Sequence, residues 1–355
     1  MKKILVYGMT ENPGGIESYI MNYYKRITPQ RIHFDFVVCD KTIAYKNEIE
    51  TRGGKIFFIP GRRENLLNHM AGLRRIAKQG YDAVYFNLLS ASEFFSVISV
   101  KGIAGIKIIV HSHNNYVKTI KRHLFLRQFL NMAVDKRLAC SEEAARFMFG
   151  RHSKDAVVIQ NAIEIEKYLF NPPVRKKIRE ENNIGNNFLV GHVGRLCYQK
   201  NTLFLLDIFS ELHKKNPNTK LVIIGDGEDR QKVLDKISEL SLNEYVIMTG
   251  AIRNVNEWMQ AMDVFLLPSR FEGLPVVAIE AQAAGLPCVF SDTFSKASAV
   301  TENVEFLPLS LSAGEWGERV LLHGGENRKN TYVELTEAGY NIENEVENLC
   351  GILEE

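Results

Sequence analysis

Short apolar runs alternate with longer amphipathic segments along nearly the whole chain. The apolar runs have the length and the content of β-branched residues that are typical of buried strands. In the first half of the chain they predict strands at Ile4–Tyr7, Phe34–Cys39, Lys55–Ile59, Ala83–Asn87, Lys107–His111, Arg137–Ala139 and Val157–Gln160. In the second half they predict strands at Leu189–Val193, Lys220–Ile224, Val246–Thr249, Val264–Leu267 and Pro287–Phe290.

The amphipathic segments between these runs repeat their apolar residues at helical spacing, which predicts helices. The clearest examples are Ile16–Arg26, Leu66–Lys78, Glu93–Val100, Thr202–Lys215 and Arg230–Leu240. Strands that alternate with helices form parallel sheets covered by helices on both faces. Over 355 residues, this pattern predicts an α/β protein with two doubly wound domains.

A change of pattern marks the expected boundary between the domains. Residues Glu164–Glu181 are rich in charge and contain two adjacent prolines, which predicts a connecting segment. We therefore expect a first domain at residues 1–165 and a second at residues 166–338. The remaining residues, 339–355, repeat apolar side chains at helical spacing and predict a closing helix.

Composition and targeting signals narrow the class of protein. Apolar residues make up 45% of the chain and charged residues 24%, as in ordinary globular proteins. The first residues start a strand without the apolar core of a signal peptide, and no apolar run has the roughly 18 residues that span a bilayer. The five cysteines are scattered, without metal-site or disulfide spacing. We expect a cytoplasmic protein with reduced thiols.

The charge is unevenly distributed along the chain. Residues 1–175 carry a net charge of +12 and the rest of the chain −10, which indicates an anionic partner for the first half. A basic cluster there interleaves Lys101, Lys107, Lys118, Lys121, Arg122 and Arg127 with Val117, Ile120, Leu124, Phe125, Leu126 and Phe129. This mixture is typical of a helix on an anionic membrane. A core-facing helix with a solvated basic edge is the alternative. Nucleic acid is not an expected partner, because no nucleic-acid module accompanies the charge.

Two glutamates flank a predicted helix start in the second half. Glu272 lies in the run Ser269–Pro275, ahead of an apolar helix expected at Val276–Ala284 that carries Glu280. Pro275 suits the first helical position, where its missing N–H is no loss. The unpaired N–H groups of a helix start attract phosphate. A carboxylate on either side suits hydroxyl groups, so the layout fits a sugar nucleotide. A buried helix with one capping and one ion-paired glutamate is the alternative.

Glycine turns close three predicted strands of the second half. Gly194 and Arg195 follow the first of these strands, with Lys200 five residues further on. Glycine lets the backbone approach an anion closely, and Arg and Lys supply charge suited to a diphosphate. Gly225 and Gly250 close the next two strands. Plain structural turns with solvated cations are the alternative.

The first domain has two weaker candidate segments. Paired glycines that end at Gly15 open a predicted helix and are followed by Glu17, an arrangement that again presents N–H groups to an anion. A tight turn with a helix cap is the alternative. His111 and His113 end another predicted strand. We expect their rings to point to opposite faces, which makes them a poor metal pair, with only His113 facing a ligand. A structural role is the alternative for both.

The run from Phe265 to Phe290 resembles the nucleotide-sugar segment of the retaining glycosyltransferases of family 4, which have the GT-B fold. The resemblance extends over most of the chain and is most specific from Gly191 to Asp292. It implies two Rossmann-like domains that face each other across a cleft, with the donor bound mainly by the second domain and the acceptor by the first. It also implies that the closing helix packs back on the first domain.

The resemblance implies roles for individual residues as well. Glu272 is expected to face the donor sugar, Glu280 to bind the ribose hydroxyls, and the loop around Gly250 to hold the base. The implied catalytic set is Glu272, His113, Arg195 and Lys200. The implied donor-binding positions are Gly15, Gly194, Arg195, Lys200, Gly225, Gly250, Ile252, Glu272, Gly273, Leu274, Pro275 and Glu280. On the acceptor side they are Gly14, Glu17 and Asn114.

Missing motifs limit the chemistry further. No Asp-x-Asp pair ends a predicted strand, so we expect no catalytic metal and no cofactor. The chain also lacks a Gly-x-Ser-x-Gly elbow, a Walker loop and a Gly-x-Gly-x-x-Gly turn after the first strand. These absences argue against a hydrolase, an NTPase and an NAD-dependent dehydrogenase.

The sequence thus predicts a metal-independent, retaining hexosyltransferase that uses a nucleotide-sugar donor. UDP is the expected nucleotide because it is the commonest in the family. The resemblance to bacterial capsule, exopolysaccharide and O-antigen transferases, with the basic first half, predicts a saccharide acceptor linked to lipid. The expected location is the inner face of the cell membrane. Two alternatives are a GT-B-like sugar-nucleotide epimerase and a non-catalytic protein that binds sugar nucleotides.

Overall fold

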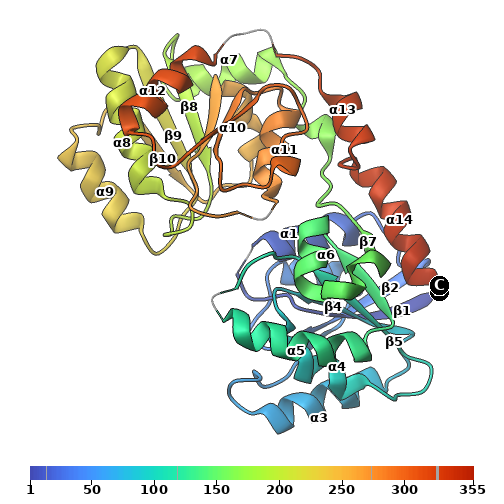
Figure 1. Ribbon diagram of the computed structural model, residues 1–355. Coiled ribbons are helices and arrows are strands. Elements are labelled where there is room, and N and C mark those ends of the chain that lie inside the picture. Colours follow the sequence, from blue (N-terminus) through green and yellow to red (C-terminus); the bar gives the residue numbers. More distant parts are fainter. Residues whose placement is uncertain (13, 118, 273, 325–327) are drawn as a thin grey trace. The chain divides into compact units, whose positions relative to one another are not determined.

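The computed structural model of the chain describes residues 1–12, 14–117, 119–272, 274–324 and 328–355. The chain divides into two compact units, one of residues 1–162 with 341–355 and one of residues 163–340 (Figure 1). The chain therefore leaves the first unit three residues earlier than the sequence pattern predicts, and it rejoins that unit at Asn341. Each unit is built on one parallel sheet, which confirms the predicted α/β class.

The first unit has a seven-stranded sheet in the order β3-β2-β1-β4-β5-β6-β7. Its order reverses between β1 and β4, the point at which doubly wound sheets bind ligands outside the carboxyl ends of the strands. The strands are β1 Lys2–Tyr7, β2 Ile32–Val38, β3 Ile56–Phe58, β4 Ala83–Leu88, β5 Lys107–Ser112, β6 Lys136–Ala139 and β7 Ala156–Val158. The predicted strands of this half are confirmed within a few residues at their ends.

Helices cover both faces of this sheet because successive strand residues point to opposite sides. Ile4 packs with α1, α2 and α14, whereas Leu5 packs with α3, α4, α5 and α6. The helices are α1 Gly15–Tyr24, α2 Lys46–Thr51, α3 Leu66–Ala77, α4 Phe94–Val100, α5 Ile120–Ala133, α6 Glu142–Phe149 and α14 Ile342–Glu354. The sequence pattern did not predict α2 and α6.

The closing helix α14 packs on the first unit. Its apolar residues Val346 and Leu349 are buried in the same core as Ile4. At its surface, Arg31 pairs with Glu354 at 2.7 Å and with Glu347 at 2.8 Å. The apolar stripe read from the sequence therefore faces the first sheet.

The second unit repeats the architecture with a six-stranded sheet in the order β10-β9-β8-β11-β12-β13. Its strands are β8 Phe188–Val193, β9 Thr219–Ile224, β10 Val246–Gly250, β11 Val264–Leu267, β12 Cys288–Ser291 and β13 Val304–Leu307, the last not predicted. Its helices are α7 Pro172–Glu181, α8 Thr202–Lys215, α9 Arg230–Glu239, α10 Val255–Ala261, α11 Val276–Ala283, α12 Ala313–Leu322 and α13 Tyr332–Glu337. Short 3-10 turns lie at Ala91–Glu93, Gly150–Asp155, Ile165–Lys167 and Lys296–Ser298.

The prediction of a connecting segment at Glu164–Glu181 is wrong for its second half, all of which belongs to helix α7. Asn171 caps this helix by accepting a hydrogen bond from Val174 N at 3.2 Å. The two prolines, Pro172 and Pro173, occupy the first helical positions, where no N–H is required. Adjacent prolines therefore start a helix here instead of marking a linker.

Membrane spans were also sought in the described part of the chain. None of its helices is both long and apolar enough to cross a bilayer.

Candidate active site

The loops that follow β8 and β11 meet at the point where the second sheet reverses its strand order. Two hydrogen bonds hold the loops together. Arg270 N donates to Gln199 O at 2.8 Å, and Asn201 Nδ2 donates to Pro268 O at 3.0 Å. Doubly wound folds bind nucleotides at this point of the sheet. The sequence motifs around Gly194 and Glu272, far apart along the chain, are thus brought to one edge of the sheet.

Glycine turns let the ends of β8, β9 and β10 approach each other. Gly194 N donates to Ile224 O at 2.9 Å, and Gly225 N donates to Gly250 O at 2.9 Å. Gly225 has a φ of +137°, and a Cβ there would lie 2.0 Å from Gly194 O. Only glycine fits that position without displacing backbone. The structure therefore brings together the three glycines Gly194, Gly225 and Gly250 that the sequence singled out.

An ion pair joins the two strongest sequence candidates. Lys200 Nζ lies 2.6 Å from Glu272 Oε1, and the two side chains are only 13% and 6% exposed. The other carboxylate oxygen of Glu272 accepts a hydrogen bond from Gln199 Nε2 at 3.1 Å. A carboxylate that water reaches this little interacts strongly with its partners. The sequence analysis missed Gln199, although it directly precedes Lys200.

Arg195 lies in the same loop but in a different environment. Its guanidinium pairs with Glu228 at 3.0 Å, with side-chain exposures of 69% and 57%. An ion pair this exposed is weak, because water screens both charges. Arg195 can therefore change partners at little cost when an anion binds.

Glu280 lies on α11 and is held by a residue from the start of the second unit. Tyr168 OH donates to Glu280 Oε1 at 2.7 Å. Burial raises the pKa of Glu280 above its ordinary value, and the hydrogen bond from Tyr168 opposes that rise. Burial and the nearby carboxylate of Glu280 raise the pKa of Tyr168 as well. Tyr168 gave no signal in the sequence, since 112 residues separate it from its partner.

The start of α11 differs slightly from expectation. Pro275 is the cap residue, with φ −71° and ψ 123°, and not the first helical residue. Its carbonyl accepts from Ala278 N at 3.0 Å. Leu274 packs, partly buried, on a small apolar cluster, and Ile252 packs on the core beneath α10. Gly273, also expected to bind the donor, lies outside the described residues.

A buried histidine near this edge escaped the sequence analysis. The His192 ring is inaccessible to solvent, and its Nδ1 donates to Leu266 O at 3.0 Å. Its Nε2 has no hydrogen-bond partner among the described residues. Burial, together with the nearby Lys200 charge, lowers the pKa of His192 to about 4. The ring is therefore neutral at physiological pH.

This histidine makes the second unit sensitive to acid. The pKa of His192 is about 4 when folded, against an ordinary 6.5, so the unfolded chain binds the proton more readily. The resulting stability is complete above pH 6.5 and is lost as the pH falls towards 4, by about 2 kcal/mol at pH 5. The free energy of unfolding should be lower at pH 5 than at pH 7, and we expect His192→Gln to remove the part of that difference that His192 causes. Unfolding in urea, followed by fluorescence of Trp258 and Trp316, measures it. An unchanged pH dependence in the variant would contradict the assignment.

In the first unit, Glu17 is turned inward. Its Oε1 accepts hydrogen bonds from Thr10 N at 2.9 Å and Thr10 Oγ at 2.7 Å, and the side chain is buried. It thus fixes the loop between β1 and α1. Gly14 is the cap of α1, where a Cβ would lie 2.9 Å from Glu17 Oε2, and Gly15 begins the helix with open space around its Cα.

The two histidines of the first unit correct an expectation. Their rings stack with centroids 4.1 Å apart and do not point to opposite faces. The physical reason is that residues two apart in an extended chain lie on the same face. His111 Nδ1 lies 2.6 Å from Tyr85 OH, and His113 Nε2 lies 2.9 Å from Asn87 Oδ1. His111 is therefore part of a polar network and more than apolar packing.

Burial lowers the pKa of His113 to about 3, so its imidazole is neutral at physiological pH. A neutral ring offers a hydrogen bond but no positive charge. Asn114, the neighbouring acceptor-side candidate, uses its side chain locally. Its Oδ1 accepts from Asn115 N at 3.0 Å, and its Nδ2 donates to Tyr116 O. Asn114 thus shapes the turn in which His113 lies.

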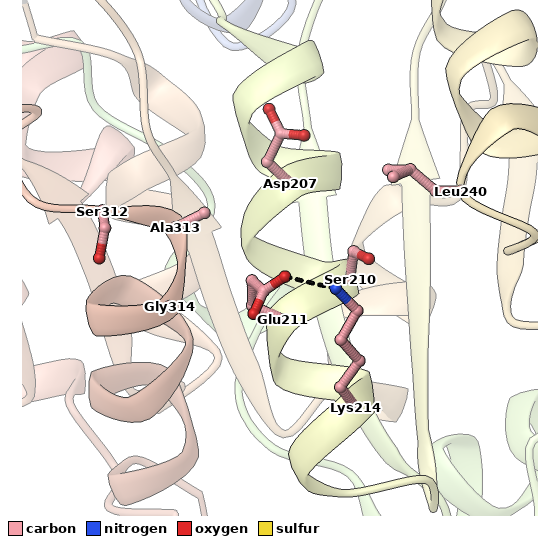
Figure 2. A pocket seen from close by; sticks show the side chains of 8 residues that line it. All are labelled: Asp207, Ser210, Glu211, Lys214, Leu240, Ser312, Ala313 and Gly314. Atoms are coloured by element: carbon pink, nitrogen blue, oxygen red, sulfur yellow. Dashed lines mark hydrogen bonds and ion pairs between the residues drawn. The ribbon is translucent and has the colours of Figure 1, made fainter.

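Figure 2 shows a surface pocket between α8 and the start of α12, whose lining includes no residue of the loops after β8 and β11. Its charged groups are already paired. Glu211 lies 2.6 Å from Lys214, and Asp207 lies 2.6 Å from Lys236. It offers no unpaired charge to a ligand among the described residues, so the loops after β8 and β11 remain the candidate site.

Comparisons with known families agree with both halves of the chain. A family profile described as Glycosyltransferase Family 4 matches residues 13–167, and one described as Glycosyl transferases group 1 matches residues 174–318. Together the two profiles span both units. The second contains Lys200, Glu272 and Glu280.

Individual relatives extend the comparison. The EpsF protein of Bacillus subtilis (strain 168) is 29% identical, over 99% of this chain and 96% of its own length. The UDP-Gal:alpha-D-GlcNAc-diphosphoundecaprenol alpha-1,3-galactosyltransferase of Escherichia coli is 27% identical, over 67% of this chain and 66% of its own. The crystal structure of HepE from Anabaena, in complex with UDP and glucose, superposes with a TM-score of 0.81 over 100% of both chains at 19% identity. This last likeness concerns the fold.

Proposed function

The chain belongs to glycosyltransferase family 4, and from that premise we propose that it transfers a hexose, with retention of configuration, from a UDP-sugar to a saccharide acceptor. The observation that carries the donor part is the largely buried pair of Lys200 and Glu272 in the loops that follow the neighbouring strands β8 and β11. A cation and a carboxylate side by side suit a ligand that joins a diphosphate to sugar hydroxyls.

The arrangement supports a definite division of roles. Arg195 and Lys200 neutralise the diphosphate as it leaves, and Glu272 holds hydroxyls of the sugar. The bond between C1 and the diphosphate oxygen breaks while C1 bonds to the acceptor oxygen on the same face. The acceptor proton passes to the departing diphosphate. His113, in the first unit, is neutral, so the part proposed for it in the reaction is that of a hydrogen-bonding group and not of a charge.

We propose that the reaction needs no metal ion. Two cations from one loop, together with backbone N–H groups, supply the charge that a divalent ion would otherwise supply. Activity that is unchanged by EDTA supports this part of the proposal. Activity that EDTA abolishes and Mg²⁺ or Mn²⁺ restores contradicts it.

The acceptor is proposed to be a saccharide carried by a lipid diphosphate, in the assembly of a surface polysaccharide. The support is the Escherichia coli relative, whose name specifies a diphosphoundecaprenol-linked acceptor. Incubation with UDP-sugars and lipid-diphosphate saccharides tests it. Transfer to the lipid supports the proposal. Epimerised UDP-sugar without UDP release would instead indicate an epimerase, and binding without turnover a non-catalytic protein.

The donor site predicts a specific effect of Glu280. We expect wild-type protein to be stabilised by UDP in the presence of EDTA, and Glu280→Gln to bind UDP about tenfold more weakly, since a hydrogen bond to a charged group contributes about 1.5–3 kcal/mol. Calorimetric titration with UDP and 2′-deoxy-UDP measures it. The wild type should discriminate between the two and Glu280→Gln should not. Glu257→Gln, a change of a partly exposed glutamate on α10, is the control. Equal discrimination in both variants would contradict the ribose role.

We further propose that the first unit lies on an anionic membrane through helix α5. Its outer face is apolar: Ile120, Leu124, Phe125, Phe129 and Met132 are all solvent-exposed. In the sequence, the segment that contains α5 carries charge of one sign. Residues 94–134 contain six Lys or Arg and no Asp or Glu. Exposed apolar groups among cations fit an anionic bilayer surface.

The structure corrects one residue of the basic and apolar cluster predicted from the sequence and does not describe another. Leu126, counted there among the membrane-facing residues, is buried in the core against the sheet. Lys118 lies outside the described residues. The apolar face of α5 is thus set by four residues of the predicted cluster with Met132 added, the most exposed of them at 79%.

Vesicle binding tests the membrane proposal. We expect sedimentation with phosphatidylglycerol vesicles but not with phosphatidylcholine vesicles, weakened by salt. The double variant Phe125→Glu/Phe129→Glu should lower the partition by tenfold or more, because about 25 cal/mol is lost per Å² of apolar surface left in water. Leu322→Glu, a change of an apolar residue of the second unit that is 72% exposed, is the control. Absence of wild-type binding, or an equal loss in the control, would contradict the proposal.

A further inference from the structure

The pair formed by Lys200 and Glu272 presents a conflict for ligand binding. Both groups belong to the proposed donor site, yet they form an ion pair with each other at 2.6 Å. A diphosphate that recruits Lys200 must draw it away from a carboxylate that is only 6% exposed. A buried carboxylate that loses its cation is strongly unfavourable unless other donors replace it.

The ligands differ in whether they can replace that cation. A UDP-sugar brings sugar hydroxyls, which can donate hydrogen bonds to Glu272 as Lys200 turns to the diphosphate. UDP alone brings the diphosphate and no sugar. With UDP, the hydrogen bond that Glu272 keeps among the described residues is the one from the Gln199 amide, 3.1 Å away. Separating the ion pair therefore lowers the affinity for UDP more than the affinity for the UDP-sugar.

We propose that Lys200 and Glu272 exchange partners when the donor binds, and that this exchange makes the site prefer a UDP-sugar over UDP. The proposal rests on the proposed function, and it adds a device for selectivity and for product release. Once the sugar has left, Glu272 pairs with Lys200 again, and the affinity of the site for UDP falls. Glu272 is in this sense a specificity-determining residue as well as a sugar ligand.

The exchange predicts a gain in affinity from removing a charge in the site. Glu272→Gln frees Lys200, so UDP should bind about tenfold more tightly, whereas the UDP-sugar should gain nothing or bind more weakly. Gln199→Leu should act in the opposite sense on UDP, because it leaves Glu272 to hold Lys200 more firmly. A merely structural role for Glu272 would not tighten any ligand.

Calorimetric titration of each variant with UDP, UDP-glucose, UDP-galactose and inorganic diphosphate decides the matter. Inorganic diphosphate reports on the freedom of Lys200 without requiring recognition of the base. Glu228→Gln is the matched control, because it removes a carboxylate from Arg195, but one that is 57% exposed and screened by water. It should change the UDP affinity by less than about twofold, as expected for an exposed pair.

The outcomes separate the two proposals. Tighter binding of UDP and diphosphate by Glu272→Gln supports the exchange, and more so if Gln199→Leu binds UDP more weakly. Unchanged or weaker binding by a folded Glu272→Gln overturns it while leaving the proposed function intact. If the wild type binds no nucleotide, the proposed function fails. The response of Glu272→Gln to inorganic diphosphate then still decides whether Lys200 is held back.

Discussion

Replacing Lys200 by methionine is expected to lower the rate of sugar transfer by about 100- to 1000-fold, the usual loss when one preorganised group that stabilises developing charge is removed. The Lys200 side chain is only 13% exposed, so water screens its charge on the leaving diphosphate little. Release of UDP from the UDP-sugar, with acceptor or by slow hydrolysis without one, measures the rate. Lys200→Arg should restore part of it, because the charge is kept.

The control for this prediction is Lys214→Met. Lys214 lies on α8 in the same unit and also pairs with a glutamate, Glu211 at 2.6 Å, but its side chain is 66% exposed. It should leave the rate unchanged. Thermal unfolding checks that both variants are folded. A Lys200→Met protein that unfolds like the wild type and retains a third of its rate would remove Lys200 from the mechanism.

The largest stability effect is expected at Asp263, which lies at the opposite end of the same sheet. Its buried carboxylate accepts a hydrogen bond from Leu189 N at 2.7 Å and pairs with Arg175 at 2.6 Å and Arg179 at 3.3 Å. A third guanidinium, that of Arg328, lies close by, and burial lowers its pKa to about 9. Asp263→Ala leaves buried cations without their carboxylate.

We expect Asp263→Ala to destabilise the second unit by about 3–5 kcal/mol, the loss typical of breaking a buried ion pair. For a unit of this size, that corresponds to a fall in melting temperature of about 10 °C. Both tryptophans of the chain, Trp258 and Trp316, lie in the second unit, so their fluorescence reports on its unfolding alone.

Asp207→Asn provides the comparison within the same unit. Asp207 pairs with Lys236 at 2.6 Å, but its side chain is 39% exposed, so the loss should stay below about 1 kcal/mol. A similar loss in the two variants would show that burial does not set the strength of the Asp263 network. We therefore expect the end of the sheet with Asp263 to contribute to stability, and the opposite end, with the loops after β8 and β11, to carry the candidate chemistry.

Much of the candidate site could be predicted from the sequence because its signals are local. Glycine at a strand end, a cation close after it and a glutamate before a helix are each visible within about ten residues. The structure brings Gly194, Lys200 and Glu272 to one edge of the second sheet. The family resemblance added the roles, which local chemistry alone left open.

Other residues could not be predicted because their partners are distant. Tyr168 holds Glu280 across 112 residues, and Gln199 holds Glu272 across 73. His192 looked like an ordinary strand residue, and only its buried position lowers its pKa. The stacking of His111 on His113 was mispredicted, since the alternation of an extended chain places them on one side.

The sequence by itself determined the alternation of strands and helices and the two doubly wound units, because backbone geometry fixes the spacing of apolar residues. It also determined which loops carry charge and glycine. The tertiary structure alone decided that Lys200 pairs with Glu272. It also decided that α7 is a helix joined to Asp263 through Arg175, and that an apolar face of α5 is exposed. These contacts depend on which strands lie next to each other, and on crossovers that no local pattern specifies.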